Sequence, residues 1–233
     1  MKPDKRILTI LFIVLAVSNV MAESAEKWEP ALNKDGIQVF TREIAGSDFY
    51  EFMGITIIDA RIEVLEEIIK DVASHNDWIA DRKESVVVKT IDNTKMVIYS
   101  VTKAPWPVSN REALVISEKH TNYKSGIVTF DINATDEPKV PVKQGNVRIT
   151  ELKAQWVLTY ISRERTKVIY TMRSNPGGNI PKTIANMSSR NFPYRTLLGM
   201  KKMATRDTFL AAARASETGK EIEKCIAAGI LKQ

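Results

Sequence analysis

The feature that most constrains this chain is a long succession of segments in which apolar and polar residues alternate. The clearest example is the stretch around residue 130, where Val128, Phe130 and Ile132 have polar neighbours. A period of two buries one face of a strand and leaves the other in water, which is typical of an antiparallel sheet. Turn-forming residues separate such segments. Nine strands are expected, at 37–42, 48–58, 84–91, 94–103, 110–119, 126–133, 145–152, 153–161 and 166–174.

Helical spacing of apolar residues occurs in two places. One helix is expected over about 61–74, and a longer one begins at Pro181, after the turn at 175–179, and extends to about Ala215 with a break near 191–193. The expected order is a short helix, two strands, a helix, seven strands and a long helix. A sheet curled around a long amphipathic helix encloses an interior that is either packed solid or left hollow for a ligand.

The first 22 residues differ from the rest of the chain. A basic start at 2–6 is followed by an almost unbroken apolar run at 7–17 and by small or compact residues up to Ala22. This is the layout of a secretory signal peptide, and the apolar run is shorter than the roughly 20 residues of a membrane-spanning helix. We therefore expect cleavage after Ala22, a domain at 23–216 and a C-terminal tail at 217–233. The expected location is the periplasm of a Gram-negative cell, or otherwise the outside of the cell.

Composition excludes several classes of protein. Without residues 1–22 the chain has 31 basic and 27 acidic residues, a net charge of +4 over 211 residues, which is too mild for a nucleic-acid partner that favours a dense basic stripe. The single cysteine, Cys225, excludes a disulfide framework and a cysteine-built metal site. The two histidines, His75 and His120, have no companions at the spacing of metal ligands. No metal or cofactor is expected.

Four short stretches carry a family resemblance. They are Trp28 followed by Asp-Gly-Ile-Gln-Val-Phe at 35–40, Asn-Asp-Trp at 76–78, Pro-Trp-Pro-Val-Ser-Asn-Arg-Glu at 105–112, and Asn-Pro-Gly-Gly-Asn-Ile-Pro at 175–181. In this order they span about 27–215. Together with the expected strands they resemble the START domain, the lipid-transfer domain related to the steroidogenic acute regulatory protein.

The resemblance implies an α+β helix-grip fold, in which a curved nine-stranded antiparallel sheet surrounds a long C-terminal helix and an apolar cavity. It also implies a monomer that binds one lipid, such as a sterol or phospholipid, and carries or senses it without a cofactor or a covalent step. Sterol-binding relatives can carry an arginine in the tunnel where this chain has Ser117, and Arg148 and Arg173 lie on other expected strands. A fatty acid, a phospholipid and a terpenoid therefore remain alternatives to a sterol.

The cavity residues expected from this reading lie on the strands, the Pro-Trp-Pro loop and the last helix. They are Val97, Tyr99, Val101, Trp106, Ser117, Phe130, Trp156, Leu158, Tyr170, Met172, Ile184, Met187, Leu197 and Met200. The same side chains also suit a solid core, because most inward-facing aromatic residues simply pack. Arg111 and Glu112 are expected to form an ion pair that anchors the Pro-Trp-Pro loop to the sheet.

Two other functions are kept open. One is an enzyme resembling polyketide aromatase/cyclase proteins, with Glu51, Tyr99, Arg148 or Arg173 as inward ionisable groups, although no acid–base pair stands out. The other is an interaction module with a filled interior. The basic side of the last helix has two interpretations, an ordinary solvated face or, in a lipid carrier, a surface for transient contact with an anionic membrane; its residues are Arg195, Lys201, Lys202 and Arg206.

Overall fold

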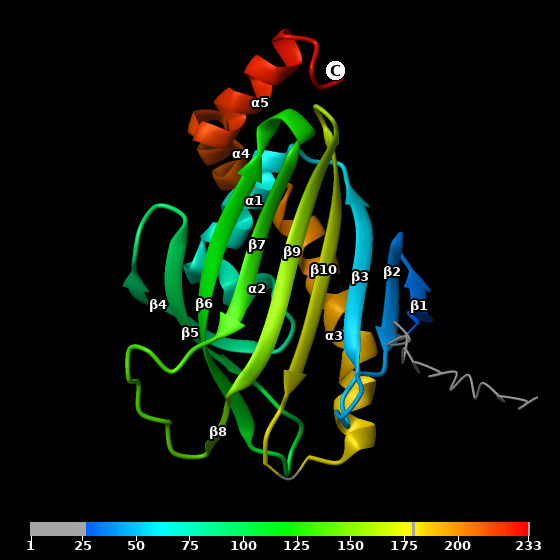
Figure 1. Cartoon of the computed structure of the whole chain (residues 1–233), viewed down its shortest axis with the longest axis vertical. Helices are drawn as coiled ribbons and strands as arrows, with labels where there is room; N and C mark the ends of the chain where they lie inside the picture. The colour runs from blue at the N-terminus through cyan, green and yellow to red at the C-terminus, as the bar shows by residue number, and fades with distance from the viewer. Residues whose placement is uncertain (1–26, 179, 233) are drawn as a thin grey trace, which may run out of the picture.

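The computed structural model describes residues 27–178 and 180–232, so the expected signal peptide at 1–22 lies outside the described residues. The sheet runs in the order β1-β2-β3-β10-β9-β7-β6-β5-β4 with antiparallel neighbours, and β8 pairs with β6 in parallel. Figure 1 shows these strands side by side. Their bounds are β1 Glu29–Lys34, β2 Ile37–Arg42, β3 Glu51–Ile58, β4 Arg82–Thr90, β5 Lys95–Thr102, β6 Asn110–Asn122, β7 Ile127–Ala134, β8 Asn146–Ile149, β9 Glu151–Ser162 and β10 Arg165–Asn175.

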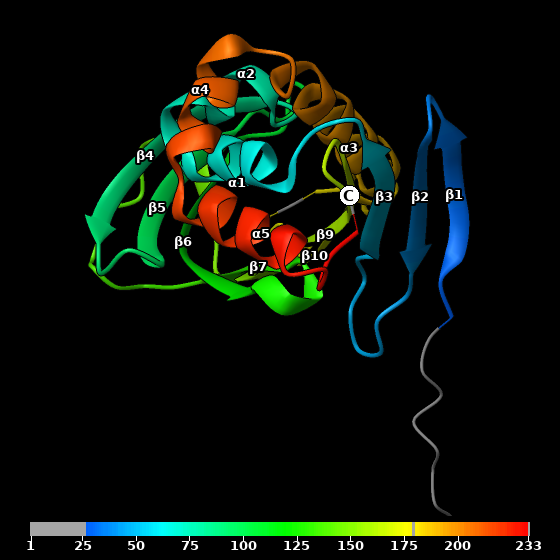
Figure 2. The ribbon, with the colours of Figure 1, turned by 90° about the horizontal axis from the view of Figure 1, so that it is seen from above.

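The helices lie within the curve of the sheet and across one of its ends (Figure 2). They are α1 Ile62–Lys70, α2 His75–Trp78, α3 Lys182–Met203, α4 Asp207–Ala215 and α5 Glu217–Ala227, with 3-10 turns at Val72–Ser74 and Tyr123–Ser125. Nine antiparallel strands wrapped around a long C-terminal helix confirm the predicted helix-grip fold.

Two expected elements differ from the strands that the structure contains. The segment expected as a short helix before the turn at 33–36 is β1, which pairs with β2. The expected strand at 145–152 is divided into β8 and the start of β9. β8 is only four residues long and joins the edge of β6, where its pairing to Arg111 and Ala113 builds part of the site described below.

The last helix continues through the break that was expected near 191–193. α3 includes Pro193, and the chain bends instead at 204–206, before α4. Proline inside a helix removes a hydrogen bond, yet Pro193 is buried and packs on β3, where a side chain at Gly54 would lie 3.3 Å from Pro193 Cβ. Packing of α3 on the sheet therefore overrides the local preference of proline.

The segment expected as a C-terminal tail forms part of the domain. α5 places Ile222 and Ile226 in the main hydrophobic core, together with residues of α1 and the sheet. Ser216 caps the helix, since its Oγ accepts a hydrogen bond from the Gly219 amide at 3.0 Å. None of the helices in the described residues has the length and apolar character needed to cross a membrane.

Candidate functional site: a cavity between the sheet and α3

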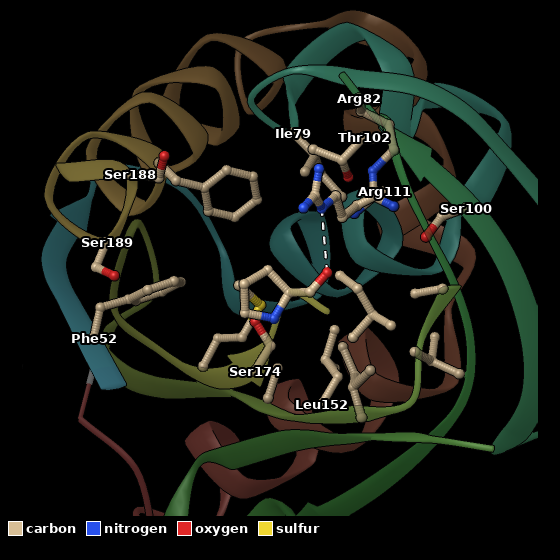
Figure 3. A pocket seen from close by; sticks show the side chains of 18 of the residues that line it. Phe52, Ile79, Arg82, Ser100, Thr102, Arg111, Leu152, Ser174, Ser188 and Ser189 are labelled. Carbon is tan, nitrogen blue, oxygen red and sulfur yellow. Dashed lines mark hydrogen bonds between the residues drawn. The ribbon is translucent and has the colours of Figure 1, made fainter. Parts of the chain in front are cut away.

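A cavity of about 250 Å³ lies between the inner face of the sheet and α3 (Figure 3). Its wall is mainly apolar and comes from β3, the α1–α2 region, β5, β6, β9, β10 and α3. The apolar side chains include Phe52, Ile98, Val115, Leu152 and Phe192. The interior of the fold is therefore hollow in this region.

Aromatic side chains form one wall of the cavity. Trp156 of β9 stacks on Tyr170 of β10 with ring centroids 3.8 Å apart and ring planes 4° apart. Trp78 of α2 meets Trp156 edge to face at 5.7 Å, and Phe52 of β3 meets Tyr170 at 5.2 Å. Stacked and edge-to-face arrangements are the favourable geometries for aromatic pairs, and these four residues belong both to the hydrophobic core and to the cavity wall.

The structure places five of the expected cavity residues on its wall. They are Ser117, Trp156, Tyr170, Met172 and Ile184. The four strand residues among them belong to β6, β9 and β10, whose inward faces continue the alternation seen in the sequence.

The three residues expected on β5 face the opposite side of the sheet. The cavity is lined by Ile98, Ser100 and Thr102, whereas Val97, Tyr99 and Val101 pack with Leu114 against Val140 of the loop that covers the outer face. Because that loop covers β5, both of its faces are buried and alternation alone does not show which one is inward. This part of the prediction is wrong by one residue in phase.

The remaining expected residues lie away from the cavity for two reasons. Four are in the solid part of the core, nearly all of their surface covered: Phe130, Leu158, Leu197 and Met200. Two are on the surface, since Trp106 is 93% exposed and Met187 is 59% exposed. Met187 faces outward on α3, and the loop around Trp106 presents its ring to solvent, so both are corrections to the expected lining.

Arg111 and Glu112 do not pair with each other, because neighbours on a strand point to opposite faces. Arg111 faces the cavity and donates to three backbone carbonyls: Ser109 at 2.6 Å, Gly177 at 3.0 Å and Pro176 at 3.2 Å. It thus joins the β5–β6 loop to the loop before α3. We call the part of the cavity beside these two loops the loop end; it is lined by Lys103, Ala104, Pro105, Pro176 and Ile180.

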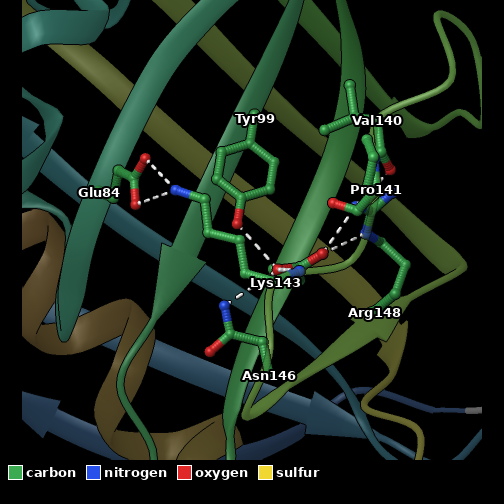
Figure 4. Close-up of polar contacts among 8 residues, drawn as sticks. Glu84, Tyr99, Val140, Pro141, Lys143, Asn146 and Arg148 are labelled. Carbon is green, nitrogen blue, oxygen red and sulfur yellow. Dashed lines mark hydrogen bonds and ion pairs between the residues drawn. The ribbon is translucent and has the colours of Figure 1, made fainter.

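Glu112 points to the outer face, where its carboxylate has no exposed surface. Figure 4 shows the polar residues of this face, among them Tyr99, Asn146 and Arg148. It accepts hydrogen bonds from Arg148 at 2.6 Å, the Tyr99 hydroxyl at 2.8 Å and the Asn146 amide at 3.0 Å. The Lys143 backbone amide adds a fourth at 3.1 Å. Burial opposes ionisation, but these donors hold the pKa of Glu112 below its ordinary value. The carboxylate therefore fastens the covering loop to β6.

Two basic or titratable residues of the cavity wall were not expected there. Arg82 begins β4 opposite Thr102 of β5, and His75 of α2 donates from Nε2 to the Ile69 carbonyl at 2.9 Å. Burial lowers the pKa of His75 to about 4, and the hydrogen bond to Ile69 offsets part of this effect. Arg82 points inward because it pairs with Thr102 of β5. Predicting this direction requires knowing which face of β5 is inward, and the sequence does not show that.

Comparisons with known proteins agree with this architecture. The START domain family model matches residues 15–197. An uncharacterized protein of Pseudomonas aeruginosa is 30% identical over 203 residues, which are 86% of this chain and 98% of the relative. The phosphatidylcholine transfer protein of Bos taurus is 27% identical over 174 residues, which are 73% of this chain and 80% of the relative.

Solved structures give the same result. A STAR-related lipid transfer protein from Xanthomonas axonopodis has a TM-score of 0.71 at 29% identity, over 77% of this chain and 99% of that structure. The human StAR-related lipid transfer protein 5 has a TM-score of 0.71 at 16% identity, over 80% of this chain and 90% of that structure, which is a likeness of fold alone. The chain belongs to the START domain family.

Proposed function

We propose that this protein binds a single lipid, with the apolar part of the ligand in the cavity between the sheet and α3, and carries or senses it. The observation that supports this function is the cavity itself, because its wall is largely apolar. Water covering an apolar surface costs about 25 cal/mol per Å². A lipid held against Phe52, Trp156 and Phe192 is relieved of that cost while it moves between membranes.

The size of the cavity favours a slender ligand. Small-molecule sites commonly measure roughly 300–1,000 Å³, and this cavity measures about 250 Å³. One acyl chain or a compact ring system enters with small rearrangements, whereas a phospholipid with two chains requires α3 or the loop end to move outward. A sterol, a terpenoid, a fatty acid and a phospholipid all remain within this class of ligand.

An enzyme is less well supported than a carrier. The four ionisable residues considered for catalysis do not line the cavity. Glu51 pairs with Arg42 at 2.6 Å, Arg148 with Glu112, Tyr99 lies on the outer face and Arg173 is exposed. Catalysis requires such groups within reach of the substrate, and these four are turned away from the space where a substrate would lie.

The membrane contact is better assigned to the loop end than to the basic side of α3. Arg195 pairs with Asp81 at 2.9 Å, Arg206 pairs with Asp77 at 3.0 Å, and Lys201 donates to a backbone carbonyl. The two ion pairs reduce the positive field that Arg195 and Arg206 present, and the hydrogen bond holds the Lys201 side chain against the protein. Trp106, exposed and next to Pro105 of the cavity wall, is the kind of side chain that settles at a membrane–water interface.

Export through a signal peptide is the location we propose. It rests on the basic, apolar and small-residue layout of positions 1–22. In a Gram-negative cell this location is the periplasm, where a carrier would speed the movement of lipids through water between the two membranes. N-terminal sequencing of the protein from its host would show Glu23 as the first residue, and retention of Met1 would contradict this proposal.

Filling the cavity tests the proposed function. Ala113 and Ala154 are buried on the wall, so Ala113→Phe and Ala154→Phe place a ring where the ligand would lie. We expect lipid uptake from vesicles to fall at least several-fold in both variants. Ala212→Phe, at an exposed position on α4, is the matched control and should take up lipid normally. Uptake unaffected by both cavity variants would contradict a lipid site in this cavity.

A further inference from the structure

The charge of the cavity wall is unbalanced. Of the described residues that line it, Lys103, Arg82 and Arg111 are basic, and none is aspartate or glutamate. A cavity built only to hold hydrocarbon has no use for a guanidinium group, because transferring a charge into an apolar space is costly unless a partner meets it. Three backbone carbonyls meet the Arg111 guanidinium, so Arg82 is the group that points to the chemistry of the ligand.

Strand register places the two arginines on one row of the inner face. Arg82 of β4 lies opposite Thr102 of β5, and Thr102 lies opposite Arg111 of β6. Because neighbouring strands are 4.7–4.9 Å apart, the two backbones are separated by about 10 Å. Figure 3 shows both side chains reaching into the cavity from the same side, with Thr102 and Ser100 close by.

Arg82 has no protein partner for its charge among the described residues. Its Nε is buried without an acceptor, and no carboxylate of the described chain lies within ion-pair distance of it. Burial lowers the pKa of Arg82 to about 10, so the group is still a cation at neutral pH. Trp78, another wall residue, likewise has a buried indole N–H without an acceptor. Two residues of the cavity wall therefore have a buried donor that no acceptor of the described residues meets.

The backbone holds Arg82 in place rather than letting it turn outward. The preceding residue, Asp81, has a φ of 55° and forms a bidentate ion pair with Arg195 of α3, both oxygens at 2.9 Å. The Asp81 carbonyl accepts a hydrogen bond from the Lys103 amide at 2.8 Å, and the Arg82 amide donates to the Ile79 carbonyl. Asp81 is thus fixed on the outside and Arg82 on the inside.

We propose that the ligand is a lipid with an anionic head, a carboxylate or a phosphate, which Arg82 binds inside the cavity with Arg111 and the Trp78 N–H nearby. This inference rests on the proposed function and specifies its ligand class. Arginine presents paired donors that match the oxygens of both groups. A quaternary ammonium head is disfavoured at the same place, because two guanidinium groups repel it and no carboxylate on the wall offsets them.

The test compares four ligands with the same eighteen-carbon unsaturated chain: oleate, oleoyl lysophosphatidic acid, oleyl alcohol and oleoyl lysophosphatidylcholine. Trp78 and Trp156 lie on the cavity wall, so quenching of intrinsic fluorescence reports binding. We expect the wild-type chain to bind the two anionic ligands at least about ten-fold more tightly than the other two. The comparison of oleate with lysophosphatidic acid then distinguishes a carboxylate from a phosphate head.

Variants assign the preference to Arg82. Arg82→Met should weaken binding of the anionic ligands by about ten-fold or more and leave oleyl alcohol nearly unchanged, while Arg82→Lys retains part of the preference. Lys83→Met removes the same charge from the exposed neighbour on β4 and should change nothing. Equal binding of oleate and oleyl alcohol by the wild-type chain, which needs no variant to fold, would overturn the anionic head while leaving a lipid carrier in place. Absence of binding by all four ligands would contradict the proposed function itself.

Discussion

At the scale of single residues, the buried position of His75 gives its imidazole a different pKa in the folded chain than in the unfolded chain. The imidazole is buried beside Trp78, with ring centroids 5.5 Å apart, and it lines the cavity. Its folded-state pKa of about 4 lies below the ordinary value of 6.5. The unfolded chain therefore binds a proton more readily than the folded chain between these two pH values.

This difference predicts a loss of stability in mild acid. The contribution of His75 is complete above pH 6.5, and it decreases by about 3 kcal/mol in total as the pH falls from 6.5 to 4. An NMR titration of the His120→Gln variant, which leaves one imidazole, should show His75 titrating near pH 4. His75→Gln should make the unfolding free energy less dependent on pH in this interval. Titration of His75 near 6.5 would contradict the structure.

Gly199 illustrates how one missing side chain sets a helix contact. A Cβ at this position of α3 would lie 2.3 Å from the carbonyl oxygen of Trp78, which is a backbone atom that cannot move aside easily. Glycine in a helix normally costs about 1 kcal/mol relative to alanine, so an ordinary site would be stabilised by alanine. Here the sign is reversed because the backbones of α2 and α3 touch.

We therefore expect Gly199→Ala to lower the unfolding free energy by about 1–3 kcal/mol, as overpacking in a core does. Chemical denaturation followed by circular dichroism measures it. Thr183→Ala, at an exposed position of the same helix, serves as the control and should change stability by less than about 0.5 kcal/mol. An increase in stability for Gly199→Ala would show that α2 and α3 are not in contact.

Residue positions could be predicted from the sequence only where one face of a strand is wet. On β9 and β10 the strand neighbours of Trp156 and Tyr170 are only half-buried and include the polar Gln155 and Thr171, so the inward face follows from the alternation. On β5 both faces are buried, so Val97, Tyr99 and Val101 fit either side equally well. Arg82 was missed for the same reason, because its direction depends on its partner on β5.

At the scale of elements, the buried Glu112 carboxylate connects β6 to the loop at 136–146. Glu112→Gln should lower the unfolding free energy by about 3 kcal/mol at neutral pH, because it leaves Arg148 without its charge partner. Since the folded-state pKa is lowered, the stabilisation is complete above the ordinary glutamate pKa of about 4.3 and is lost as the pH falls below it. The difference between variant and wild type should therefore shrink in acid.

Hydrogen exchange shows which part of the chain loses stability in the Glu112→Gln variant. In Glu112→Gln the amides of 136–146 should exchange faster, while those of β9 and β10 keep their protection. Glu84→Gln is the control, because the Glu84–Lys143 ion pair is partly exposed and contributes little. Unchanged exchange in the loop would mean that Glu112 does not fasten it.

The type and order of most elements could be predicted from the sequence, whereas the points where the C-terminal helices begin and end could not. Alternation and turns identified the antiparallel sheet and the C-terminal helix, which depend on long periodic segments. The continuity of α3 through Pro193 and the packing of α5 could not be predicted, because both depend on contacts with distant segments: Gly54 in the first case and the core around Ile222 in the second. Local preference is the weaker influence at such points.

At the scale of the whole molecule, the interior consists of a solid core and a hollow region. Ile62, Leu65, Leu158 and Leu197 are fully buried in the solid part, whereas α3 and the two loops at the loop end cover the hollow part. The three carbonyl contacts of Arg111 join these two loops. We therefore expect ligand exchange through movement at the loop end to leave the solid core undisturbed.

Membrane contact at the loop end predicts a kinetic effect. Trp106→Ala should slow lipid transfer between vesicles several-fold, while the equilibrium affinity and the melting temperature stay the same because the ring is 93% exposed. Vesicle-to-vesicle transfer of a fluorescent lipid measures the rate. The double variant Lys201→Glu, Lys202→Glu tests the basic side of α3, and a larger loss of rate in it than in Trp106→Ala would contradict the assignment to the loop end.

The most direct measurement is native mass spectrometry of the protein purified from its own host without detergent. We expect one bound lipid-sized molecule per chain, released on unfolding, and no such molecule on the Ala113→Phe variant. A wild-type chain that carries no such molecule, and takes none up from a lipid extract of the host, would contradict it.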